Sequence, residues 1–99
     1  MSTSKSNATA PAILSIRDSK GEVPQGGATA DTSVIVEGRA EPGRRLEVFD
    51  GTLLKGEMYV GAPGNWSMHL GRLENGPHSI TASVDGAVSN ARTFSVRPQ

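Results

Sequence analysis

The chain of 99 residues contains no cysteine, only four aromatic residues, no net charge and no long hydrophobic run. Without cysteine it has neither a disulfide framework nor a thiolate metal site. A formal net charge of zero provides no positive field for a phosphate backbone, which argues against nucleic-acid binding. No apolar run approaches the ~20 residues that a membrane helix needs, so we expect no membrane insertion.

The first ten residues, MSTSKSNATA, offer nothing to bury and lack the hydrophobic stretch that a signal peptide carries. We interpret residues 1–10 as a disordered tail or linker. Residues 11–97 are expected to form one domain, because a chain of this length supports a single modest core. Export would then use another signal, or the sequence is one segment of a longer chain.

Turn-forming residues are plentiful, with 12 glycines and six prolines. They separate short runs in which apolar and polar residues alternate, and such alternation indicates half-buried strands. No helical periodicity of useful length is present. We therefore predict an all-β fold, an antiparallel β-sandwich of about seven strands. Its strands are expected near residues 12–17, 32–40, 44–50, 54–60, 66–70, 78–84 and 88–96, with a long surface loop at 18–31.

Strand alternation also predicts the core. The first strand should point Leu14 and Ile16 inward. Trp66, the single tryptophan, should be the largest buried side chain. The full predicted core consists of the inward positions Val34, Val36, Leu46, Val48, Leu54, Met58, Trp66, Met68, Leu70, Ile80, Ala82, Val84, Phe94 and Val96.

The hairpin around Asp50-Gly51 can be predicted to the register. If Val48 and Leu54 both face the core, an odd number of residues must separate opposed partners, which favours a three- or five-residue loop. Pairing Val48 with Leu54 then sets Glu47 opposite Lys55 and Arg45 opposite Glu57 on the outer face. Each opposite-charge pair contributes roughly 0.2–1 kcal/mol.

The same reasoning across residues 61–65 pairs Val60 with Trp66 and Met58 with Met68, so that three consecutive strands form a meander. The last strand is less regular. Its parity would bury Asn90 together with Arg92, so either a bulge or an exposed first half is expected at residues 88–93.

The order of these motifs resembles the bacterial immunoglobulin-like repeats of large surface adhesins and biofilm-associated proteins. The resemblance covers about residues 11–97 and rests on Glu-Pro-Gly at 41–43, Gly-Asn-Trp-Ser at 64–67 and Asn-Gly-Pro-His at 75–78. It implies an immunoglobulin-like sandwich, with neighbouring repeats of the same chain as partners. Some relatives bind calcium at the junctions between repeats. Their Asp-rich turns are replaced here by Val-Gly-Ala-Pro at 60–63 and Asp-Gly-Ala-Val at 85–88, so we expect no cofactor and regard junctional calcium as the minor alternative.

No constellation of acid, base and nucleophile is visible, so no catalytic or metal-binding residue is predicted and the protein is expected not to be an enzyme. The two histidines, His69 and His78, should lie apart. His78 is interpreted as a residue that packs or caps the preceding loop. The aspartates that could contribute to calcium binding more simply start or end turns. They are Asp18, Asp31, Asp50 and Asp85.

The leading hypothesis is a structural spacer, one repeat of a bacterial cell-surface or secreted protein, with its termini at opposite ends. An alternative is a carbohydrate- or protein-binding module that presents the candidate ligand face of Phe49 and Tyr59 to a host or matrix glycan or protein. A third reading is an accessory domain of a larger enzyme. An isolated copy is expected to be monomeric.

Overall fold

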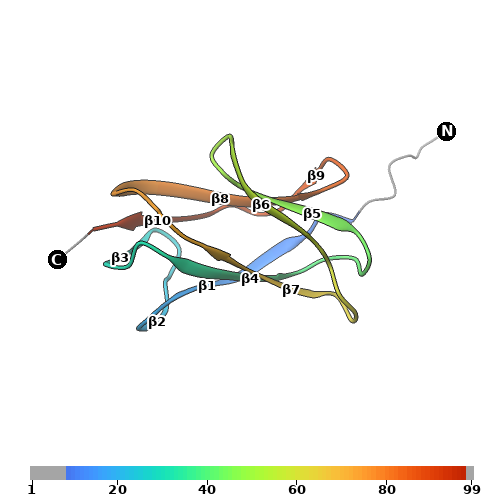
Figure 1. Cartoon of the computed structure of the whole chain (residues 1–99), viewed down its shortest axis with the longest axis horizontal. Coiled ribbons are helices and arrows are strands. Elements are labelled where there is room, and N and C mark those ends of the chain that lie inside the picture. Colours follow the sequence, from blue (N-terminus) through green and yellow to red (C-terminus); the bar gives the residue numbers. More distant parts are fainter. Residues whose placement is uncertain (1–8, 98–99) are drawn as a thin grey trace.

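The computed structural model describes residues 9–97, and within them every regular element is a β-strand. No helix in this part of the chain has the length and apolar character to cross a membrane. The strands form two layers (Figure 1). One sheet has the order β2-β1-β4-β7, made of Gly21–Glu22, Ala12–Asp18, Val34–Arg39 and Asn65–Leu70. The other has the order β3-β10-β8-β5-β6, made of Gly27–Thr29, Arg92–Val96, Gly76–Val84, Arg45–Asp50 and Leu53–Tyr59, with β9 (Ala87–Val88) attached to β8.

This strand order is that of an immunoglobulin-like sandwich. The first, second and fifth of its long strands (β1, β4 and β7) form one sheet, and β5, β8 and β10 form the core of the other. Seven strands have five or more residues, which confirms the predicted class of fold. The three short strands β2, β3 and β9 are additional, and β3 pairs with β10 in parallel, the exception among otherwise antiparallel pairs.

The core lies between the two sheets. Trp66 is 3% exposed, and a Cβ at Gly38 would come within 2.6 Å of its ring, so the indole lies against the glycine. Eleven of the fourteen predicted core residues are buried: Val34, Val36, Leu46, Val48, Trp66, Leu70, Ile80, Ala82, Val84, Phe94 and Val96. Met58 and Met68 are partly buried at one edge of this core. The core also includes residues that alternation did not identify, namely Ile13, Val23, Val60 and Leu73.

Two leucines that were predicted to be buried are exposed, Leu14 by 58% and Leu54 by 46%. In both strands a register irregularity reverses the expected side. In β1 the register shifts between Ile13 and Ser15, so Ile13 takes the inward place. A bulge inserts an unpaired residue, and every side chain beyond it changes face relative to simple alternation.

The predicted register of the β5–β6 hairpin is wrong for the same reason. Asp50 pairs with Leu53 across a two-residue turn, and a bulge beside Val48 leaves Leu54 opposite Phe49. Gly51 has φ of +62°, in the left-handed region as predicted. Arg45 is opposite Tyr59, yet its Nε still donates to Glu57 Oε1 at 2.9 Å. The expected ion pair therefore forms diagonally.

The predicted meander is also wrong, because β6 and β7 belong to different sheets. Trp66 pairs with Gly38 of β4 and Met68 pairs with Val36, instead of with β6. A connection that crosses to the opposite sheet keeps the same side chains facing the core as a hairpin does. Parity therefore cannot distinguish the two connections.

The chain enters and leaves at opposite ends of the sandwich (Figure 1). Ala12 is paired with Arg39, which is itself paired with Asn65 at the start of β7. Val96 is paired with Gly76, at the start of β8 and beyond the end of β7. The register alone thus places the two ends of the domain at opposite poles.

Candidate functional site

The most tightly organised polar cluster surrounds His78, a nearly buried residue of β8. Its Nδ1 lies 2.5 Å from Asp50 Oδ2 at the end of β5, and its Nε2 lies 2.7 Å from the carbonyl oxygen of Glu74. The imidazole stacks on Phe94, with ring centroids 5.4 Å apart. Asp50 Oδ1 also accepts the N–H of Ser79 at 3.1 Å. The cluster joins β5, β8, β10 and the loop before β8.

The electrostatics of this cluster favour a protonated ring. Burial disfavours the charged imidazolium, but the hydrogen bonds to Asp50 and to the Glu74 carbonyl outweigh it and raise the pKa of His78 above its usual value. Both ring nitrogens face acceptors, so neither offers a lone pair to a substrate or a metal. The arrangement is a structural clamp, and it caps the preceding loop as the sequence interpretation of His78 expected. The partner Asp50 was missed, since only the pairing of β5 with β8 brings it there.

The second histidine stands apart from this cluster. His69 is exposed on β7, in the sheet opposite to that of His78, and is paired with Ile35. The structure therefore does not bring the two histidines together.

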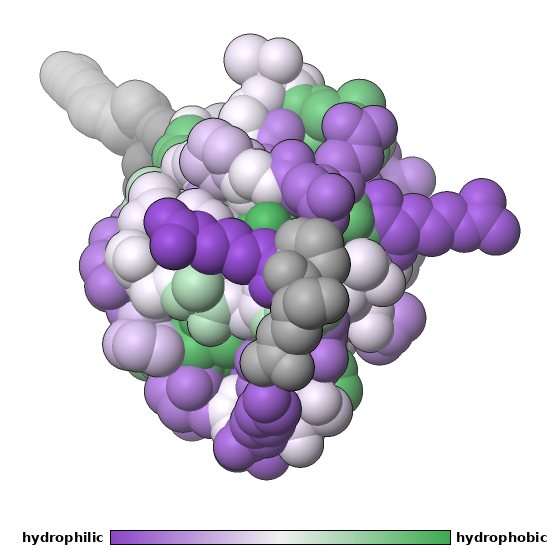
Figure 2. Space-filling model, turned by 90° about the vertical axis from the view of Figure 1, so that its left-hand side faces the viewer, coloured by the Kyte–Doolittle hydropathy of each residue, from purple (hydrophilic) through white to green (hydrophobic). Residues whose placement is uncertain are grey.

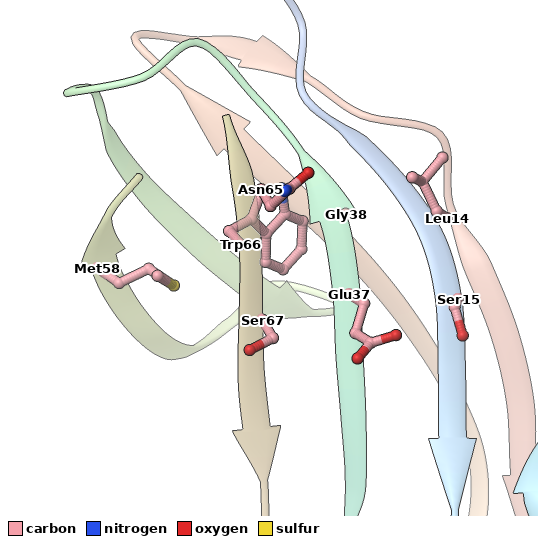
Figure 3. A pocket seen from close by; sticks show the side chains of 8 residues that line it. All are labelled: Leu14, Ser15, Glu37, Gly38, Met58, Asn65, Trp66 and Ser67. Carbon is pink, nitrogen blue, oxygen red and sulfur yellow. The ribbon is translucent and has the colours of Figure 1, made fainter. Parts of the chain in front are cut away.

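A hollow of about 530 Å³ is open to solvent beside β1, β4, β7 and Met58 of β6. Figure 3 shows the side chains that line it, which are Leu14, Ser15, Glu37, Gly38, Met58, Asn65, Trp66 and Ser67. Two of its polar groups are already engaged. Ser15 Oγ donates to Glu22 at 2.5 Å, and Asn65 Oδ1 accepts from Arg39 at 2.9 Å. The indole of Trp66 is buried and presents no exposed ring on which a sugar could stack. The hollow is open, its lining mixes polar and apolar groups, and the buried indole N–H of Trp66 has no hydrogen-bond partner among the described residues.

The candidate ligand face lies on the outer side of the second sheet. Tyr59 is 71% exposed and Phe49 is half-buried. They are paired with Arg45 and Leu54 respectively. The two pairs are four positions apart along β5, which corresponds to roughly 13 Å. The Arg45–Glu57 ion pair lies between them, so the two aromatic rings do not form one continuous platform.

Each aspartate that could contribute to calcium binding has a local partner. Asp18 accepts from the buried hydroxyl of Thr29 at 2.6 Å, a bond that lowers the pKa of Asp18, and also from the N–H of Lys20. Asp31 accepts from the N–H of Ser19 at 2.7 Å. Asp50 bonds to His78, and Asp85 pairs with Arg44 at 2.7 Å. Within residues 9–97 no group of three or more acidic, histidine or cysteine residues is arranged to hold a metal ion.

Strand alternation singled out Asn90 and Arg92 as polar residues at inward positions, but it did not predict their hydrogen bonds to the backbone of other strands. The strand breaks between β9 and β10, and Asn90 bonds to both the N–H and the C=O of Ile13, at 3.0 and 3.1 Å. The Arg92 guanidinium donates to the carbonyls of Leu14 and Val23. These side chains close the flank where β1 faces β10.

The sequence matches no protein-family model and no curated protein. Among solved structures, one similar chain is described as "Biofilm associated protein - BSP domain", with 22% sequence identity and a TM-score of 0.47. The match covers 93% of this chain and 14% of that chain. At this identity and TM-score the likeness carries no functional conclusion, and the immunoglobulin-like fold is assigned from the strand order itself.

Proposed function

We propose that this domain is a non-enzymatic spacer, one repeat of a larger bacterial cell-surface or secreted adhesin-like protein. The observation that carries the proposal is the position of the two ends. The chain enters beside Arg39 at one pole and leaves beside Gly76 at the other. Domains joined in series through opposite poles extend a chain, whereas domains joined through one pole fold it back.

The remaining features agree with a load-carrying or spacing role. The polar cluster around His78 and the contacts of Asn90 hold neighbouring strands and loops together. Viewed from the pole where the chain leaves, the surface is mainly hydrophilic and its hydrophobic areas are small and separate (Figure 2). Such an end is suited to a neighbouring domain that is connected mainly through the linking polypeptide and not through a large apolar interface.

The test is the length of tandem copies. Polypeptides of one, two and three copies of residues 1–99 are compared by small-angle X-ray scattering. The nine-residue strand β8 spans roughly 30 Å, so the maximum dimension should grow by at least this amount per copy while the cross-section stays constant. A control with ten additional Gly/Ser residues at each junction should give a broader distance distribution. A cross-section that doubles on adding the second copy would contradict the spacer.

The binding-module alternative stays a hypothesis with its own measurement. Loss of glycan or protein binding in Tyr59→Ala, at unchanged stability, would favour it over the spacer. Phe49→Ala should reduce the same binding only if the two rings act together.

A further inference from the structure

The two flanks of the sandwich differ. On one, Asn90 and Arg92 join the layers through hydrogen bonds to the backbone of β1 and of Val23. On the other, β6 and β7 are the last strands of their sheets, and each is paired on one side only within residues 9–97. An edge strand with unpaired N–H and C=O groups is a template for another strand.

Natural edge strands usually carry features that prevent pairing, such as bulges, charges or proline. The edge of β6 has a bulge and two charged residues, Lys55 and Glu57. The edge of β7 has none of these features. Its six residues, NWSMHL, pair with β4 without a register shift and include no proline, lysine, arginine or acidic residue. The strand β7 is therefore regularly paired along its length, and His69 is its one titratable residue.

The two edges lie one above the other. A Cβ at Gly56 would come 2.9 Å from Met68 Sδ, so the middle of β6 lies over the middle of β7. A twofold axis at this point, perpendicular to the sheets, would pair β7 with β7 of a second copy in antiparallel register about Met68. The same axis would pass near Gly56. It would bring Lys55 of each copy toward Glu57 of the other, because these residues stand on either side of Gly56 in the chain, with Lys55 at the bulge of β6.

We propose that this β6–β7 flank pairs side by side with the same flank of a second copy, through β-augmentation at β7 and reciprocal Lys55–Glu57 contacts. Charge complementarity points to an identical copy as the occupant, and the net charge of zero gives two copies no overall repulsion. A six-residue edge forms a small interface, so dilute single copies remain monomeric. Pairing emerges at high local concentration, as where many copies stand side by side. This inference does not depend on the spacer proposal.

The test is sedimentation equilibrium of the full chain from about 10 μM to the millimolar range. The wild type should associate reversibly to a dimer. Lys55→Glu alone sets two pairs of carboxylates against each other, and Glu57→Lys alone sets two pairs of ammonium groups against each other. Each should weaken dimerisation about tenfold, on the scale of opposed charge pairs. An equimolar mixture restores both attractive pairs and should dimerise at least as well as the wild type.

Lys20→Glu is the matched control, because it makes the same charge change at the exposed turn between β1 and β2. It should leave dimerisation unchanged. Ser67→Lys, beside the axis on β7, is a second variant that does not disturb Arg45 and should also weaken pairing. A wild type that stays monomeric at the highest concentration would overturn the proposal. So would a mixture that dimerises no better than its separate components, or a Lys20→Glu effect as large as that of Lys55→Glu.

Discussion

At the scale of single residues, the domain depends on a few matched neighbours. The buried indole of Trp66 occupies the space that a side chain at position 38 would need, and glycine is the residue that leaves it free. Asn90 supplies β1 with a donor and an acceptor in place of a neighbouring strand. Both ring nitrogens of His78 face acceptors, one the carboxylate of Asp50 and the other the carbonyl oxygen of Glu74. In each case one side chain fills a space or makes hydrogen bonds that the strands alone would leave empty or unmade.

The Trp66–Gly38 contact predicts two destabilising substitutions. Trp66→Ala should cost about 3–5 kcal/mol of unfolding free energy, because it leaves a large cavity. Gly38→Ala should also destabilise, by about 1–3 kcal/mol or more, since its methyl group would collide with the ring and with the carbonyl oxygen of Ala12. Gly61→Ala is the control, because a Cβ there meets no atom within 4 Å. Urea denaturation measures all three, and a neutral Gly38→Ala would contradict the contact.

The His78 clamp predicts a pH dependence of stability. The pKa of His78 is raised in the folded state, so the native protein holds the proton more tightly than the unfolded chain does. The stabilisation is complete below the unfolded pKa of about 6.5 and is lost as the pH rises through the folded pKa. His78→Gln should flatten this part of the profile of unfolding free energy against pH, and the exposed His69→Gln should not. Identical profiles for His78→Gln and the wild type would argue against the clamp.

At the scale of elements, alternation located the strands but not the bulges. Leu46 and Val48 are inward as predicted from parity, whereas Leu54, the next core position by the same count, lies outside. The energetic preference for one register is the sum of several small terms, including turn geometry and cross-strand contacts. A local rule cannot evaluate that sum when one unpaired residue is inserted.

The bulge in β6 predicts unequal effects of two leucine substitutions. Leu46→Ala should cost about 2–5 kcal/mol of unfolding free energy, as for a fully buried leucine. Leu54→Ser should change stability by much less, about 0.5 kcal/mol, because Leu54 is 46% exposed and lies outside the buried core. Thermal and urea unfolding provide the comparison. A similar loss of unfolding free energy in both variants would contradict the bulge and favour the register that was predicted from the sequence.

At the scale of the whole molecule, the packing of the layers gives each aspartate a hydrogen-bond or ion-pair partner within the domain. Asp18, Asp31, Asp50 and Asp85 lie in three separate local networks instead of one cluster. The same arrangement braces one flank and, among residues 9–97, leaves two strand edges without a partner strand on the other. Both the separation of the aspartates and the difference between the flanks follow from the assignment of strands to the two sheets.

The distribution of aspartates predicts that calcium does not stabilise an isolated copy. A ligand that binds only the native state must raise the melting temperature, by an amount that grows with its concentration. We expect equal melting temperatures for a single copy in millimolar calcium and in chelator. Two tandem copies, measured in the same way, test the junction separately. A calcium-dependent increase in the single copy would show an intrinsic site.

The sequence by itself determined the class of fold, the approximate strands and most of the core, because side-chain alternation and turn chemistry act over a few neighbouring residues. It also predicted the Arg45–Glu57 pair, although from a register that set the two residues directly opposite each other, whereas Arg45 is opposite Tyr59. Only the tertiary structure decided that β6 and β7 part into different sheets, that Asp50 meets His78 and that Asn90 braces β1. Those contacts join residues 28 and 77 positions apart, and they depend on the packing of whole layers, which no local pattern encodes.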